Sequence, residues 1–260
     1  MLLAITRAVS RSIVDCELTN LARTPIDVER ARRQHAQYET ALRSLGVAVL
    51  SLPEEPDLAD SVFVEDTALV LDECAVLLRP GADSRRPETG LIEPVLAPYR
   101  RLFRVQAPAR VDGGDLLRLG KDIYMGISTR SDAAAAAQLQ AILRPFGYEL
   151  HPAPVTGCLH LKSAVTQVAQ EALLINPRWV DKSLFGGVKC IEIDASESYA
   201  ANALWIGDRI LYPAAFPKTA QRLEAAGIRM VPVEADELAR AEGALTCCSL
   251  IFEAFQRPSE

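Results

Sequence analysis

Five stretches of the chain share one pattern: a cluster of polar or small residues, then an apolar run, a turn and a second apolar run. They begin at the sequences FVEDTALV, VDGGDLL, LHLKSAV, SYAANALW and TCCSLIF. The units can be aligned on the residue that precedes the first apolar run, which is Asp66, Asp115, Lys162, Asn202 or Cys248. Successive residues of this set lie 49, 47, 40 and 46 positions apart. A spacing of this size, held along the whole chain, indicates a repeat architecture.

Between these hairpin patterns the periodicity changes to that of a helix. The segments 28–46, 130–147 and 218–227 have helical patterns that end on glycine, whereas 87–108 is irregular and 178–193 has the weakest helical pattern. Short strand-like runs follow the helices, for example VAVLSLP and RMVPVE. The repeating unit is therefore predicted to be β-β-α-β.

The last unit lacks its second strand, and MLLAITRAV at the N-terminus is expected to supply it. A unit split between the two termini would close a ring, as the first and last strands do in propellers. We therefore predict an α/β fold in which residues 1–260 form a single domain, a five-bladed pseudo-symmetric propeller of ββαβ units. The alternative is an ordinary α/β sheet in which hairpins and helices alternate.

Composition excludes several classes of protein. The net charge of -6 argues against a nucleic-acid partner, which would require a basic face. No apolar run is long enough to cross a membrane, so no membrane partner is expected. The N-terminal apolar stretch is too short for a signal peptide and has no basic segment before it, so we interpret it as a strand of a cytoplasmic protein.

The six cysteines do not form a recognisable metal motif. There is no CxxC pair and only three histidines are present, so a structural zinc site is not expected. In a reduced cytosol, Cys74 and Cys190 are interpreted as small buried apolar residues. Cys247 and Cys248 are adjacent in an expected strand, where neighbouring side chains point to opposite faces, so one thiol should be buried and the other should face a different environment.

A reactive thiol needs a base or a cation nearby to become a thiolate. His35 lies in a helical pattern and is expected to be a surface or packing residue. His151 lies in an expected strand without polar neighbours in the sequence. His160, in GCLHLKS, occupies the position equivalent to the polar clusters of the other units, and it is therefore the candidate base.

The carboxylates of DSVFVED require an explanation, because Asp60 and Glu65 lie among apolar residues where an unpaired carboxylate is costly. A cationic ligand would lower that cost, and a planar guanidinium can bind carboxylates through paired hydrogen bonds. A thiol, an imidazole and carboxylates around a guanidinium favour attack on the guanidinium carbon.

Seven motifs together carry a family resemblance: DSVFVEDTALV, RPGADSRRPE, VDGGDLL, ISTR, LHLKSA, ESYAANALW and GALTCCSLI. In this order and at these spacings, they resemble the dimethylarginine dimethylaminohydrolases, or dimethylargininases, over nearly the whole chain. The resemblance implies the five-bladed α/β-propeller, or pentein fold, of guanidino-modifying enzymes. It also implies a nucleophile at Cys247, a general acid and base at His160, and a supporting carboxylate at Asp112, with Cys248 as the buried neighbour.

The same resemblance implies how a substrate is held. Glu65 and Asp66 match the carboxylates that bind the guanidinium, and Arg85 and Arg130 match the arginines that bind the α-carboxylate. The remaining matches are Asp60 near the amino group, Ala241 through its backbone, and Leu18 in a lid, where Leu21 is the alternative. Because a dimethylated nitrogen has no proton to donate, we expect an apolar wall beside it and assign this wall to Phe63.

The implied reaction converts an Nω-methylated arginine to citrulline and an alkylamine through a covalent S-alkylthiouronium on Cys247. No metal and no organic cofactor are expected, and the partner is a small-molecule substrate. A homodimer is compatible with the sequence, which does not fix the oligomeric state. The alternatives on the same fold are an arginine deiminase and a citrulline hydrolase, and a non-catalytic propeller that binds a macromolecule is the alternative from another class.

Overall fold

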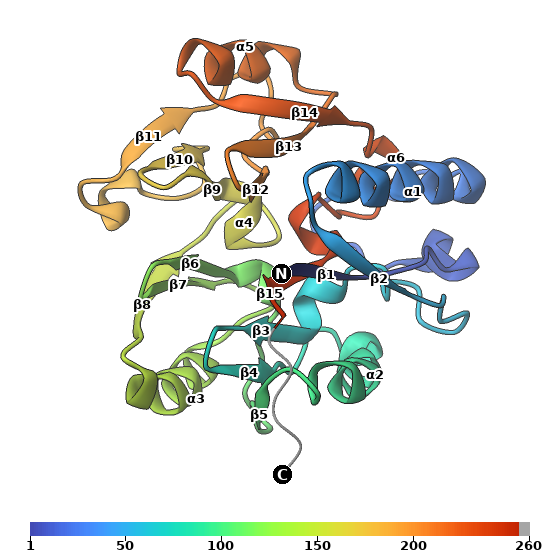
Figure 1. Ribbon diagram of the computed structural model, residues 1–260, viewed down its shortest axis with the longest axis vertical. Helices are drawn as coiled ribbons and strands as arrows, with labels where there is room; N and C mark the ends of the chain where they lie inside the picture. Colours follow the sequence, from blue (N-terminus) through green and yellow to red (C-terminus); the bar gives the residue numbers. More distant parts are fainter. Residues whose placement is uncertain (255–260) are drawn as a thin grey trace.

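The computed structural model describes residues 1–254 and contains fifteen strands within them. In chain order the strands are β1 (Leu2–Arg7), β2 (Ala48–Leu52), β3 (Ala68–Val70), β4 (Cys74–Leu77), β5 (Arg101–Arg104), β6 (Leu116–Leu119), β7 (Asp122–Ile127), β8 (Glu149–Pro154), β9 (Val165–Ala169), β10 (Ala172–Ile175), β11 (Lys189–Glu192), β12 (Leu204–Ile206), β13 (Arg209–Pro213), β14 (Arg229–Val233) and β15 (Leu250–Glu253). They form five separate three-stranded sheets, which follow one another around the molecule in Figure 1.

Every sheet has the same internal order. Two strands pair antiparallel, as β3 with β4, and the second of them pairs parallel with a third strand, as β4 with β5. A parallel pair needs a crossover connection, and a helix or a helical turn lies in each of these connections. The predicted β-β-α-β unit is therefore confirmed.

One sheet joins the two ends of the chain. Strand β15 pairs antiparallel with β1, so that Leu3 lies opposite Phe252, and β1 pairs parallel with β2. The expectation that the N-terminal segment completes the last unit is confirmed by this pairing. It ties the two termini together through backbone hydrogen bonds.

The α-helices are α1 (Val28–Ser44), α2 (Arg86–Leu96), α3 (Ala133–Leu143), α4 (Leu161–Ala164), α5 (Pro217–Ala225) and α6 (Asp236–Ala239). In Figure 1, α1, α2, α3 and α5 lie on the outer side of the sheets, whereas the short helix α4 lies near the centre of the view. The short 3-10 helices are η1 (Arg11–Asp15), η2 (Val64–Thr67), η3 (Asp83–Arg85), η4 (Gly113–Asp115), η5 (Arg144–Phe146), η6 (Lys182–Phe185) and η7 (Thr246–Cys248). No helix among residues 1–254 is long and apolar enough to span a membrane.

Local sequence explains where these helices begin. The carboxylates of Asp27 and Asp132 accept backbone N–H groups in the first turns of α1 and α3, which satisfies donors that have no partner within the helix. The third unit, with the weakest helical pattern, contains only the 3-10 helix η6 in its crossover. Its residues still connect β10 to the parallel strand β11.

The hydrophobic core is divided into five clusters, each of which lies between two sheets. Ile5 of β1 packs in one cluster with Leu77 of β4, and Leu173 of β10 packs in another with Leu117 of β6. The other clusters join β4 to β6 and β7, β9 and β10 to β13, and β1 to β13 and β14. Each sheet therefore shares apolar side chains with the next, and the fifth sheet shares them with the first.

Repeat-equivalent polar side chains connect successive units. Asp66 accepts the backbone N–H of Gly114 at 2.9 Å, and Asp115 accepts that of Leu161 at 2.9 Å. Asn202 accepts the N–H of Thr246 at 3.3 Å. Hydrogen bonds satisfy these buried polar groups, so the sequence repeat has a structural basis in unit-to-unit contacts.

Candidate active site

The polar clusters meet because each lies just before the first strand of its sheet. The helical turns η2, η4, α4 and η7 contact one another, although they come from distant parts of the chain. They bring together Glu65 and Asp66, Asp112, His160 and Cys247, all of which are less than 9% exposed. The predicted convergence of the clusters is confirmed as a spatial arrangement.

His160 and Asp112 form the first pair of the site. The His160 Nε2 lies 3.0 Å from Oδ2 of Asp112, whose Oδ1 accepts the backbone N–H of Gly81 at 2.7 Å. A Cβ at Gly114 would lie 2.5 Å from the His160 ring, so this position of VDGGDLL must be glycine for the imidazole to fit. His160 occupies the N-cap position of α4, directly before that helix.

Arg85 is at the centre of a second buried group. Its guanidinium donates to Asp66 at 2.5 Å, to Glu88 at 2.8 Å and to the carbonyl of Phe63 at 3.0 Å. Arg85 therefore already has carboxylate partners in the described structure. The sequence motifs did not single out Glu88, although it lies three residues after Arg85, which is one helical turn.

Lys162 and Glu65 form a third pair, which sequence reasoning missed. The Lys162 Nζ lies 2.6 Å from Glu65 Oε1, and the Thr246 hydroxyl donates to Glu65 Oε2 at 3.1 Å. Asn202 in turn donates to that hydroxyl at 3.0 Å. The only available signal was the placement of Lys162 two residues after His160, because its partner is 97 residues away in the chain.

The two adjacent cysteines do not lie in a strand. They end the 3-10 helix η7, and β15 begins only at Leu250, so strand alternation does not separate their side chains. Both are buried, with Cys247 7% and Cys248 1% exposed. Cys248 donates to the carbonyl of Ala244 at 3.4 Å, while burial and the neighbouring carboxylates of Glu65 and Asp66 raise the pKa of Cys247 well above its usual value.

The neighbouring carboxylates favour the charged form of the His160 imidazole, whereas they favour the neutral form of the Cys247 thiol. Burial alone would lower the pKa of His160, but Asp66, Asp112 and Asp115 outweigh it and raise this pKa to about 9. Burial likewise opposes ionisation of Asp66, but Arg85, His160 and the Gly114 N–H hold its pKa at about 2. At neutral pH these pKa shifts favour an imidazolium, an ionised Asp66 and a neutral thiol.

The predicted amino-acid-binding residues lie near the loop before α1. Asp60 accepts the backbone N–H of Glu17 at 3.0 Å, and Arg130 donates to the Thr19 hydroxyl at 3.1 Å. Arg130 also lies 3.9 Å from Asp112. Leu18 and Ala241 belong to the same apolar cluster as Cys247.

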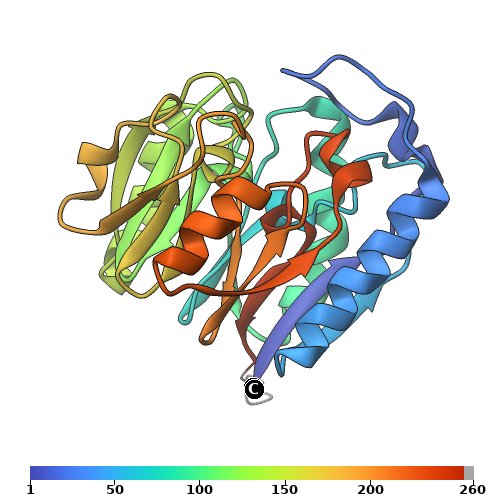
Figure 2. The ribbon, with the colours of Figure 1, turned by 90° about the horizontal axis from the view of Figure 1, so that it is seen from above.

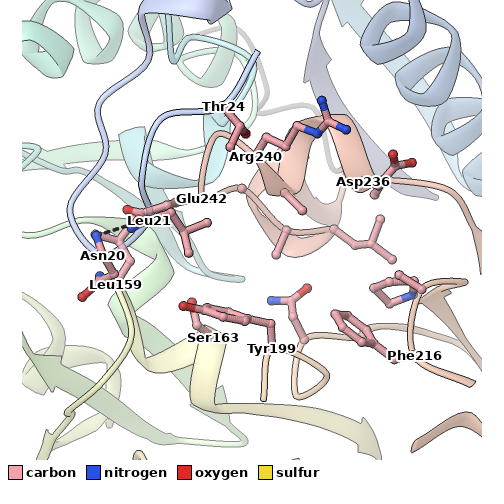
Figure 3. A pocket seen from close by; sticks show the side chains of 18 of the residues that line it. Asn20, Leu21, Thr24, Leu159, Ser163, Tyr199, Phe216, Asp236, Arg240 and Glu242 are labelled. Atoms are coloured by element: carbon pink, nitrogen blue, oxygen red, sulfur yellow. Dashed lines mark hydrogen bonds between the residues drawn. The ribbon is translucent and has the colours of Figure 1, made fainter. Parts of the chain in front are cut away.

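Phe63 and Leu21 are the remaining predicted site residues, and they lie in different surroundings. Phe63 is 3% exposed, and a Cβ at Gly243 would collide with its ring, so the ring lies directly against this backbone segment. Leu21, the alternative lid residue, lines a different space, a mostly apolar cavity of about 410 Å³ shown in Figure 3. Neither Cys247 nor His160 lines that cavity, so it lies beside the clustered polar groups and does not contain them.

The other histidines occupy different surroundings. His151 lies in β8 as expected, but its Nε2 is 2.7 Å from Asp122, which corrects the expectation that it has no polar company. The register of β7 and β8 brings the two residues together. His35 is a buried packing residue of α1. Cys74 is fully buried as expected, whereas Cys190 is only half-buried.

Among residues 1–254, two groups of side chains have ligand atoms close enough to hold a metal ion. One comprises Asp66, Asp112 and His160, and the other comprises Asp122, Glu149 and His151. In the first group, the carboxylates already accept hydrogen bonds from Arg85 and from backbone N–H groups. With these hydrogen bonds in place, the two carboxylates stabilise the protonated imidazole of His160.

Comparisons with known proteins agree with this arrangement. A family model described as N,N dimethylarginine dimethylhydrolase, eukaryotic, matches residues 19–183. The N(G),N(G)-dimethylarginine dimethylaminohydrolase of Pseudomonas aeruginosa is 36% identical over 95% of this chain and 98% of its own length. That of Streptomyces coelicolor is 36% identical over 95% of each chain. A solved structure of a cysteine-to-serine variant of the Pseudomonas aeruginosa protein, complexed with citrulline, has a TM-score of 0.92 at 35% identity and covers 96% of this chain and 98% of its own.

The fold, the site and these relatives together define a hydrolase of the class that acts on the carbon–nitrogen bonds of amidines. Within this class, the chain belongs to the dimethylarginine dimethylaminohydrolase family. The resemblance stated from the sequence motifs is confirmed.

Proposed function

We propose that this protein hydrolyses Nω-methylated arginines to citrulline and methylamine or dimethylamine. The observation that carries the proposal is the convergence of Cys247, the His160–Asp112 pair and two buried carboxylates, Glu65 and Asp66, at one place. Family membership identifies the type of substrate, and carboxylates can bind a cationic guanidinium through paired hydrogen bonds.

The substrate is held at both ends. Glu65 and Asp66 bind the guanidinium, while Arg85 and Arg130 bind the α-carboxylate. Asp60 lies near the amino group, Ala241 contacts the substrate through its backbone, and Phe63 forms the apolar wall beside the methylated nitrogen. The position of Leu18 in the same apolar cluster as Cys247 supports Leu18 over Leu21 as the residue that covers the site.

The ionisation states of the empty site suggest how the reaction starts. The cationic substrate offsets the negative charge of Glu65 and Asp66, and this charge is one cause of the raised Cys247 pKa. Substrate binding therefore favours loss of the thiol proton to solvent. The thiolate sulfur bonds to the amidino carbon, the bond to the alkylated nitrogen breaks, and the departing amine takes its proton from the His160 imidazolium.

The second half of the reaction uses the imidazole that has become neutral. His160 accepts a proton from water, whose oxygen attacks the amidino carbon of the covalent S-alkylthiouronium. The carbon–sulfur bond then breaks, the thiolate returns and citrulline leaves. Asp112 keeps the imidazole oriented and stabilises its charged form, and the route requires no metal or organic cofactor.

The proposal also covers the architecture of the chain. The five sheets are the blades of a pseudo-symmetric propeller, and residues 1–260 form one domain, of which the last six residues lie outside the described part. The cyclic order of the five hydrophobic clusters supports this interpretation. The six free cysteines support a reducing, cytoplasmic location.

Product analysis tests the substrate assignment. The purified protein is incubated with dimethylarginine, monomethylarginine, arginine and citrulline, and kcat/KM is measured for each. We expect alkylamine and citrulline from the methylated arginines and slower release of ammonia from arginine. Faster ammonia release would indicate an arginine deiminase, ornithine from citrulline would indicate a citrulline hydrolase, and no turnover would favour a non-catalytic binding protein.

A further inference from the structure

A loop covers the groups to which we assign substrate binding. Asp60, Arg85 and Arg130 are each less than 9% exposed. Within the loop of residues 17–25, the Glu17 N–H donates to Asp60 and the Thr19 hydroxyl accepts from Arg130. The loop itself is mostly exposed. In Figure 2 the blue segment that precedes α1 extends beyond the strands, at the end of the molecule opposite to the C-terminus.

One carboxylate holds the tip of this loop. Glu242 accepts the backbone N–H groups of three consecutive residues: Thr19 at 2.9 Å, Asn20 at 2.5 Å and Leu21 at 2.5 Å. Figure 3 shows Glu242 beside Asn20 and Leu21 at the wall of the 410 Å³ cavity. Asn20 and Leu21 border this cavity, so the charge-assisted hydrogen bonds to Glu242 fix the backbone of the tip at its edge.

The backbone of Glu242 is unusual in the same place. Its φ of 57° is the only positive φ at a non-glycine residue among residues 1–254. An L-residue in this conformation is strained, and such strain is typically retained where it serves a function. Glu242 also lies between two site neighbours, Ala241 and Gly243, the second of which lies against the Phe63 ring.

A chain of polar contacts also links the loop tip to the His160–Asp112 pair. Thr19 accepts from Arg130 at 3.1 Å, Arg130 lies 3.9 Å from Asp112, and Asp112 pairs with His160. The stem of the loop has separate attachments, since Arg23 donates to the carbonyls of Val14 and Cys16. Release of the tip alone would therefore expose Arg130 without unfolding the stem.

We propose that Glu242 is a positioning residue that latches the loop tip over the substrate site. It acts through the three backbone N–H groups, and it does not touch the reacting atoms. This inference deepens the proposed function and rests on it for the kinetic part of the test. When the latch is closed, Thr19 and Arg130 are held at the place where the amino-acid end of the substrate binds.

The test compares Glu242→Gln, which removes the charge, with Glu242→Gly, which removes the carboxylate and suits a φ of 57°. The control is Glu234→Gln, since Glu234 is an exposed carboxylate whose side chain is 63% accessible and lies 4.0 Å from Arg30, outside residues 17–25. Amide hydrogen exchange is measured over residues 17–25 in the absence of substrate. Loss of charge-assisted bonds predicts exchange at Thr19, Asn20 and Leu21 that is about tenfold faster in both Glu242 variants and unchanged in the control.

Steady-state kinetics with dimethylarginine give the second measurement. Because the binding-competent state becomes less populated, we expect KM to rise by about tenfold in the Glu242 variants while kcat changes less than about threefold. Unchanged exchange in both variants would overturn the latch, and faster exchange without any change in KM would overturn its positioning role. If the wild-type protein does not turn over methylated arginine, the proposed function fails, whereas the exchange result still decides on the latch.

Discussion

His160 and Asp112, 48 residues apart in the chain, face each other with 3.0 Å between the imidazole Nε2 and the carboxylate Oδ2. Both are buried, and Asp112 is fixed by the backbone N–H of Gly81. The pair is therefore rigid, and its charge state depends on burial and on neighbouring carboxylates. This arrangement leads to two separate predictions, one for catalysis and one for stability.

Replacing His160 by alanine should leave substrate binding largely intact and stop the chemistry. General acid–base assistance is typically worth roughly 10²–10⁴-fold in rate, and kcat should fall by at least this amount. The measurement is kcat for dimethylarginine, with the KD of the substrate determined separately. A fall in kcat of less than about tenfold would remove His160 from the mechanism.

The same pair should make stability depend on pH. The folded-state pKa of His160 is raised from 6.5 to about 9, so its stabilising contribution is complete below about pH 6.5 and is lost as the pH rises through about 9. The free energy of unfolding should fall by on the order of 3 kcal/mol across this range because of this residue. Denaturant unfolding of wild type and His160→Gln at several pH values isolates the contribution, and parallel pH profiles would show that it is absent.

The Lys162–Glu65 pair should behave as a unit. Lys162→Met leaves Glu65 buried without its cation, and breaking a buried pair in this way costs roughly 3 kcal/mol. The double variant Lys162→Met with Glu65→Gln removes both charges and should regain much of that loss. Urea unfolding of the two single variants and the double variant gives the coupling energy, and additive losses would mean that the pair contributes no specific interaction.

Substitution of Cys247 and of Cys248 should have different effects on turnover and on stability. Cys248→Ser places a more polar group where the side chain is 1% exposed, so it should lower stability by about 1 kcal/mol and retain turnover. Cys247→Ser should abolish turnover and change stability little. Activity and unfolding midpoints of both variants are measured, and a fully active Cys247→Ser protein would reverse the assignment.

Much of the fold was accessible from the sequence because its signal is repeated. Asp66, Asp115 and Asn202 occupy equivalent positions, and each accepts a backbone N–H from the following unit. The same contact between units therefore recurs along the chain. The pairing of β15 with β1 followed from the missing strand of the last unit. Local periodicity and turn residues were sufficient for these features.

The details of the site were less accessible, because they depend on contacts across the chain. Cys247 was expected in a strand, but it lies in the three-residue turn η7 before β15, and His160 directly precedes the four-residue helix α4. Elements of three or four residues give no periodic signal. The partners of Glu65 and His151 come from other elements, Lys162 and Asp122, and only the three-dimensional register places them. The latch at Glu242 likewise joins residues more than 220 positions apart.

The central claim is that Cys247 forms a covalent intermediate with the amidino carbon of a methylated arginine. Rapid acid quenching of the enzyme with dimethylarginine, followed by peptide mapping by mass spectrometry, measures this directly. The account predicts a thiouronium adduct on the peptide that contains Cys247, its disappearance in Cys247→Ser, and release of equal amounts of dimethylamine and citrulline. An adduct on Cys248 or on another residue, or undiminished dimethylamine release by Cys247→Ser, would contradict it.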